Sequence, residues 1–120
     1  MFTVFMPLSN SDARHYIRIV GSSTVFPLIS FIAEDFNRVF SFKTPVVESI
    51  GSGSGFKMFC SGVGENTPDI ATSSRPIKEA ERELCKRNKV SEVIEIIIGY
   101  DGVVVANSNQ SYRFDFTKKV

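Results

Sequence analysis

Three short segments of the chain combine glycine with several hydroxyl residues, and each is expected between a strand and a helix. The start of a helix presents unpaired backbone N–H groups and the positive end of the helix dipole, so it can bind an anion without net positive charge on the protein. Serine and threonine add short side-chain donors, and glycine lets the backbone approach a ligand closely. A tetrahedral oxyanion needs such donors. The three segments are Gly21–Val25, Gly51–Gly55 and Thr72–Arg75.

Each segment alone also fits a simpler interpretation, because serine and threonine are common helix caps and glycine is a common turn residue. Gly51–Gly55 lacks the lysine and hydroxyl that close a P-loop and the glycine spacing of a dinucleotide fingerprint, which disfavours nucleotide binding. Arg75 could bind two oxygens of one anion, pair with a carboxylate, or lie on the surface at a helix start. A triad of Ser23 or Ser74 with His15 as base has no matching acid nearby, so no catalytic residue is expected.

The elements that must position these segments alternate between strand and helix. Short β-branched runs predict strands, and apolar residues at helical spacing predict helices. In parallel α/β sheets the loops at the carboxyl ends of the strands meet, so the alternation predicts an α/β three-layer sandwich with a mainly parallel sheet and one shared edge for the three segments. The predicted strands cover residues 16–20, 44–50, 69–72, 93–98 and 102–106, and the predicted helices cover residues 26–40, 54 to 60 or 61, and 78–88.

Composition narrows the classes of function. The 120 residues include 14 Lys+Arg and 13 Asp+Glu, a formal charge of +1, which lacks the basic excess of a nucleic-acid-binding domain. No apolar stretch approaches the roughly 20 residues that cross a bilayer. Cys60, Cys85 and the single histidine, His15, lack the spacing of a metal site, so neither a metal nor a cofactor is expected. The cysteines could be buried free thiols in a reducing compartment or a bridge in an oxidising one.

In these segments the chain resembles the substrate-binding proteins of phosphate ABC transporters. It has GSSTVFPL at 21–28, IGSGSGF at 50–56, DIATSSRPI at 69–77 and GYDGVVVAN at 99–107, in the order and spacing of that family. The resemblance implies the first lobe of a two-lobed periplasmic-binding-protein-like fold that closes on inorganic phosphate. The phosphate-binding residues would be Ser23, Thr24, the Val25 backbone N–H, Ser52, Ser54 and Ser74, with Arg75 as a further candidate.

The resemblance has further implications. It implies a periplasmic location, a transporter permease as partner, and a disulfide between Cys60 and Cys85. Many members of the family have an aspartate where this chain has Ser74, and that carboxylate accepts the proton of hydrogen phosphate. Its absence weakens discrimination between phosphate and sulfate by that route.

The predicted organisation is a lobe over residues 16–107, a degenerate signal remnant or disordered N-terminus over 1–15, and a truncated tail over 108–120. No intact signal peptide is recognisable, which leaves cytoplasmic retention open. No loop of a second lobe is recognisable after Asn107, so we expect weak phosphate binding, with water on one face of the anion. The exposed edge of such a lobe also favours self-association. The alternatives are a lobe without a transport role and a phosphate-processing enzyme, and the missing base and metal ligands disfavour the enzyme.

Overall fold

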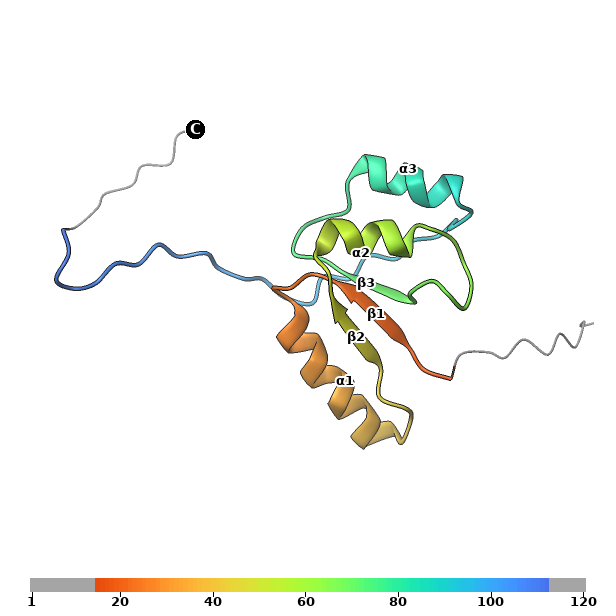
Figure 1. Cartoon of the computed structure of the whole chain (residues 1–120), viewed down its shortest axis with the longest axis horizontal. Helices are drawn as coiled ribbons and strands as arrows, with labels where there is room; N and C mark the ends of the chain where they lie inside the picture. Colours follow the sequence, from red (N-terminus) through yellow and green to blue (C-terminus); the bar gives the residue numbers. More distant parts are fainter. Residues whose placement is uncertain (1–14, 113–120) are drawn as a thin grey trace, which may run out of the picture.

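The computed structural model describes residues 15–112, and within them the chain forms one small sheet with three helices packed around it (Figure 1). Most of the predicted signal remnant and the last eight residues of the predicted tail therefore lie outside the described residues. In chain order the elements are β1 (Arg18–Gly21), α1 (Phe26–Phe40), β2 (Val46–Ser49), α2 (Ser52–Phe59), β3 (Ile70–Thr72) and α3 (Glu79–Arg87).

The sheet has β1 at its centre, with β2 and β3 on either side, and both pairings are parallel. Consecutive strand residues point to opposite faces, and Ile19 and Val20 of β1 are 7% and 0% exposed, so both faces of the central strand are covered. Figure 1 shows α1 on one side of the strands and the α2–α3 pair on the other. The predicted α/β layers and parallel sheet are confirmed.

Helix α1 begins and ends where its apolar periodicity predicts. Pro27 suits the first turn, where a missing N–H costs no helical hydrogen bond. Ser41 ends the helix in the left-handed region at φ 56°, and its N–H donates to the Asn37 carbonyl at 2.9 Å. The inner face of the helix, including the buried Ala33, packs along β2. None of the helices among the described residues has the length and apolarity to span a membrane.

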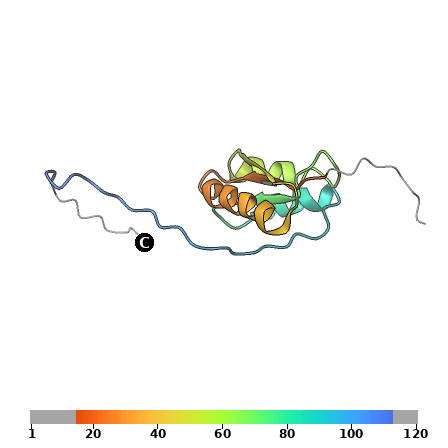
Figure 2. The same ribbon diagram turned by 90° about the horizontal axis from the view of Figure 1, so that it is seen from below.

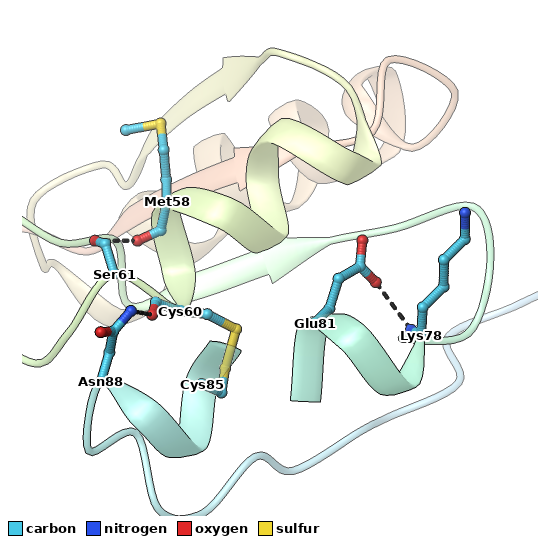
Figure 3. The surroundings of a disulfide bond; sticks show 7 residues. All are labelled: Met58, Cys60, Ser61, Lys78, Glu81, Cys85 and Asn88. Atoms are coloured by element: carbon cyan, nitrogen blue, oxygen red, sulfur yellow. Dashed lines mark hydrogen bonds between the residues drawn. A yellow bond between two sulfur atoms is a disulfide. The ribbon is translucent and has the colours of Figure 1, made fainter. Parts of the chain in front are cut away.

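A disulfide joins the end of α2 to α3. Cys60 and Cys85 are bonded and fully buried, which confirms the bridge that the family resemblance implied (Figure 3). The Asn88 side chain donates to the Cys60 carbonyl at 2.7 Å and adds a second link between the same helices. The bridge also forms the centre of a small apolar cluster, whose other members are Phe59, Leu84, Val90 and Val93.

The start of α2 differs from the prediction. The helix begins at Ser52, two residues before the predicted Ser54, because the Gly55 N–H already donates to the Gly51 carbonyl at 2.9 Å. Gly51 precedes the helix at φ 85°, which glycine adopts readily and other residues rarely do. Ser52 and Ser54 therefore both lie in the first helical turn.

The two strands predicted over 93–98 and 102–106 are wrong. These residues form no regular element, and Figures 1 and 2 both show the segment leaving the helices and strands as an extended chain. Its β-branched side chains are largely exposed, for example Ile96 at 76% and Val103 at 96%. Strand propensity expresses a fit to a paired, half-buried surface, and no neighbouring strand pairs with this segment in the described part of the chain.

Candidate anion-binding site

The three predicted segments meet at one edge of the sheet. Because β1, β2 and β3 are parallel, the loops after them all lie at their carboxyl ends. Backbone hydrogen bonds connect these loops directly. The Gly51 N–H donates to the Gly21 carbonyl at 2.8 Å, and the Ser22 N–H donates to the Thr72 carbonyl at 3.0 Å. These backbone bonds fix the starts of the three loops relative to one another.

Two glycines make the close packing at this edge sterically feasible. A Cβ atom at Gly21 would lie 2.0 Å from the Thr72 carbonyl oxygen, and the residue has φ 139°. A Cβ atom at Gly55 would lie 2.7 Å from the Gly21 Cα atom. Both clashes are with backbone atoms, which cannot turn away as a flexible side chain can. The first turn of α2 is therefore seated against the end of β1.

The hydroxyl groups of neighbouring loops bond to one another. The Ser49 hydroxyl donates to the Ser23 hydroxyl at 3.0 Å, which joins the end of β2 to the loop after β1. The Ser74 backbone N–H donates to the Ser52 hydroxyl at 3.2 Å, and the two serine hydroxyl oxygens are 3.4 Å apart. The structure therefore brings two pairs of serines together, Ser23 with Ser49 and Ser52 with Ser74. Thr24 of the first loop and Ser54 of the first turn of α2 are exposed to solvent.

The starts of α1 and α2 have no side-chain cap. Val25 is the N-cap residue of α1 and Gly51 that of α2, and in neither helix does a side chain accept a bond from the first-turn N–H groups. In helix α3 the Glu81 carboxylate accepts from the N–H of the N-cap residue Lys78 at 2.8 Å, which is one half of a capping box (Figure 3). The starts of α1 and α2 thus keep donors that could face an anion.

Arg75 pairs with a carboxylate of its own lobe. Its guanidinium donates two hydrogen bonds to Glu81, at 2.7 and 3.0 Å, and lies 5.3 Å from the centre of the Phe56 ring. The hydrogen bond from Arg75 is the main cause that lowers the pKa of Glu81 to about 2, although burial of the carboxyl opposes it. The same pair raises the pKa of Arg75. A direct role of Arg75 in binding phosphate stays a prediction.

Sequence reasoning missed two residues of this edge. Ser49 directly precedes the IGSGSGF segment, and its strand position hid its contact with Ser23. Glu81 occupies the third helical position of α3, where a capping-box carboxylate is expected, but Lys78 takes the place of the usual serine or threonine N-cap. His15 precedes β1 and therefore lies at the opposite edge of the sheet from the serines.

A hollow of about 740 Å³ also lies at the opposite edge. Its walls include Phe36 and Phe42, and its lining combines Lys43 and His15 with the carboxylates of Glu65 and Asp69. Among the described residues, this hollow has no helix start and no serine or threonine in its lining, so the anion-binding candidate remains the hydroxyl-lined edge.

Comparison with known proteins identifies the family. A model of the PBP superfamily domain matches residues 9–119. The chain belongs to this superfamily. Protein SphX of Synechocystis is 39% identical over 98 residues, which are 82% of this chain and 28% of the relative. Phosphate-binding protein PstS of Staphylococcus aureus is 31% identical over 102 residues, which are 85% of this chain and 30% of the relative.

A solved structure supports the same assignment. The crystal structure of a possible phosphate binding protein from Planctomyces limnophilus is 38% identical and superposes with a TM-score of 0.56, over 62% of this chain and 25% of that chain. The chain thus spans under a third of the length of the curated relatives that it matches. The resemblance to the first lobe of a phosphate-binding member of the superfamily is confirmed.

Proposed function

We propose that this PBP superfamily lobe binds inorganic phosphate at the carboxyl edge of its sheet. The observation that carries the proposal is the cross-loop pairing of Ser52 and Ser74 beside the uncapped start of α2. The names of the similar proteins, which include a phosphate-binding protein PstS and a possible phosphate binding protein, support phosphate as the anion. The proposed ligand groups are the hydroxyls of Ser23, Thr24, Ser52, Ser54 and Ser74 and the backbone N–H of Val25.

The binding relies on dipoles and hydroxyls more than on formal charge. The Arg75 guanidinium is neutralised by Glu81, so no uncompensated cation of these three loops faces the edge. A serine hydroxyl can donate to one oxygen and accept from another, so the Ser52–Ser74 and Ser23–Ser49 pairs can exchange their mutual bonds for bonds to an oxyanion. Hydrogen phosphate, which offers both acceptor oxygens and one O–H donor, suits such groups.

The affinity of this lobe for phosphate should be low. Ser23, Thr24, Ser54 and Ser74 are exposed, so an anion bound to them keeps water on its outer face. Water competes for the same donors and raises the effective dielectric constant, which weakens each interaction. Titration calorimetry should give a dissociation constant for phosphate well above the micromolar range. A submicromolar dissociation constant would contradict this part of the proposal.

Single serine substitutions test the site. Ser52→Ala and Ser74→Ala each remove a hydroxyl, and a hydrogen bond to a charged partner contributes about 1.5–3 kcal/mol, so the dissociation constant for phosphate should rise about 10- to 100-fold. Ser61→Ala is the matched control, because the Ser61 hydroxyl bonds only to the Met58 carbonyl near the far end of α2 (Figure 3). Equal affinities for all three variants and the unmodified chain would place phosphate elsewhere.

The physiological role that we propose is delivery of phosphate to the permease of an ABC importer, in the periplasm. The similar phosphate-binding proteins support this role, and the buried Cys60–Cys85 disulfide suits an oxidising compartment. Binding without catalysis is the better interpretation, because His15 lies at the opposite sheet edge from the serines and could not act as their base. A phosphatase assay of the purified chain, with release of phosphate as the readout, tests the alternative.

We also propose that the chain self-associates through its exposed apolar segment. The side chains of Ile94, Ile96, Val103 and Val104 are each more than 75% exposed, and large exposed apolar side chains gathered in one segment favour association. Sedimentation velocity should show a concentration-dependent dimer or larger species. Replacing Ile96 and Val104 with lysine should restore a monomer, and a chain that is monomeric at all concentrations would refute the proposal.

A further inference from the structure

We propose that Glu81, acting through Arg75, is a positioning residue for anion binding: it holds the loop that carries Ser74 against the first turn of α2. This inference rests on the proposed phosphate site. It assigns Glu81 a role that no sequence motif indicated, and it gives Arg75 a structural task in place of direct contact with the anion.

The first step is the set of contacts that hold Arg75. Besides its two bonds to Glu81, the guanidinium donates to the Pro76 carbonyl at 3.0 Å and stacks over the Phe56 ring of α2. Its Nη2 atom also lies beside the first turn of α2, 3.9 Å from the position of a Cβ atom at Gly53. One side chain therefore connects the loop after β3, the start of α3 and the first half of α2.

The second step is that Glu81 is itself held firmly. Its carboxylate accepts from the Lys78 N–H at 2.8 Å while it accepts both bonds from Arg75. It also lies in the first turn of α3, where the helix dipole stabilises a negative charge. The side chains of Glu81 and Arg75 are 14% and 30% exposed, so the pair is partly shielded from water. The carboxylate stays ionised throughout the neutral range and keeps the guanidinium in place.

The third step connects this pair to the site. Ser74 directly precedes Arg75, and the Arg75 N–H donates to the Ser73 hydroxyl at 3.2 Å while that hydroxyl donates to the Arg75 carbonyl at 2.6 Å. These bonds close a tight turn over residues 73–75. With Arg75 fixed at one end, the turn directs the Ser74 N–H to the Ser52 hydroxyl. Loss of the Arg75–Glu81 pair should release the turn and let Ser74 move away from α2.

The competing role makes the opposite prediction. If Arg75 instead contacted phosphate directly, Glu81 would compete with the anion for the same guanidinium. Removing the negative charge of Glu81 would then free Arg75 and strengthen phosphate binding. If Arg75 positions Ser74, the same change weakens binding. Glu81→Gln therefore separates the two roles by the sign of its effect, and glutamine keeps the capping bond to the Lys78 N–H.

The experiment titrates the full chain and its variants with inorganic phosphate, followed by amide NMR shifts at constant ionic strength. Glu81→Gln should raise the dissociation constant about two- to fivefold, the scale of one partly exposed ion pair, and should speed amide exchange at Ser74. Glu83→Gln is the matched control, because Glu83 pairs with Lys86 on the same helix and its removal changes net charge equally. That control should leave both the dissociation constant and the exchange rate unchanged.

A second variant probes the same ion pair from its other partner. Arg75→Lys keeps the positive charge but loses the two-pronged geometry, so it should weaken binding about as much as Glu81→Gln does. Phosphate binding by Glu81→Gln that is as tight as or tighter than that of the unmodified chain would overturn this inference alone. An unmodified chain whose amides do not respond to phosphate would overturn the proposed function and this inference with it.

Discussion

Reducing the Cys60–Cys85 disulfide should destabilise the lobe strongly. The bridge joins residues 25 positions apart and lies at the centre of a small apolar cluster. When the bridge is reduced, the unfolded chain gains conformational entropy because the loop between the two cysteines is no longer closed. The folded state also loses the covalent link between α2 and α3, which are otherwise joined by this cluster, by the bond from Asn88 to the Cys60 carbonyl, and by Arg75 between Phe56 and Glu81.

The magnitude follows from the loop length. For a loop of this size, the chain-entropy relation gives a destabilisation of about 3.5 kcal/mol at 25 °C. The total free energy of unfolding of a small domain is only about 5–15 kcal/mol, so this loss is a large share of its stability. Each 1 kcal/mol of lost stability lowers the melting temperature of a domain of about 100 residues by roughly 4–8 °C. Reduction of the disulfide should therefore lower the melting temperature by roughly 15–30 °C.

Thermal unfolding followed by far-ultraviolet circular dichroism, with and without a phosphine reductant, measures the effect. A Cys60→Ala/Cys85→Ala double variant is the control, because its melting temperature should not respond to reductant and should lie near that of the reduced chain. Oxidised and reduced samples that melt within about 2 °C of each other would refute the reasoning, since the chain-entropy relation predicts a much larger shift.

Three further predictions concern the site and its support. Gly53→Ala should stabilise the chain by up to about 1 kcal/mol, because its Cβ atom would meet only Arg75, at an ordinary 3.9 Å. Gly55→Ala should destabilise the chain by about 1–3 kcal/mol, because its Cβ atom would clash with the Gly21 backbone. Urea titrations that give the two variants equal free energies of unfolding would contradict this prediction. The pKa of Glu81 is lowered from 4.5 to about 2 on folding, so its stabilisation is present above about pH 4.5 and lost as the pH falls towards 2. The difference in unfolding free energy between the chain and its Glu81→Gln variant should shrink over that pH range, and a constant difference would be inconsistent with the shift. Ser74→Asp should favour phosphate over sulfate, because a carboxylate accepts the proton of hydrogen phosphate and repels sulfate; competition calorimetry that shows unchanged selectivity would exclude this effect.

Local patterns in the sequence were sufficient to predict helix α1 and the three strands of the sheet. Helix α1 has the predicted bounds because its apolar spacing and Pro27 act within a few turns. The strands Arg18–Gly21, Val46–Ser49 and Ile70–Thr72 lie within one or two residues of the predicted ones. Their parallel alternation with helices then dictated that the three hydroxyl-rich loops share one edge. The free cysteines and the bridge could not be told apart from the residues alone; the family resemblance favoured the bridge that the structure contains.

Contacts between distant residues were beyond such patterns. The Arg75–Glu81 and Ser49–Ser23 contacts depend on how helices and strands pack, and residue types alone allowed several partners for each. Residues 93–106 were predicted as strands for a related reason. Their residue types favour strands, but whether a strand forms depends on a neighbouring strand, and none pairs with this segment among the described residues. The order of the elements was enough to predict that the hydroxyl-rich loops and helix starts converge, because parallel strands end on the same side of the sheet. The bonds across the loops could not be predicted in this way, because they depend on a strand register and a helix packing that no single segment encodes.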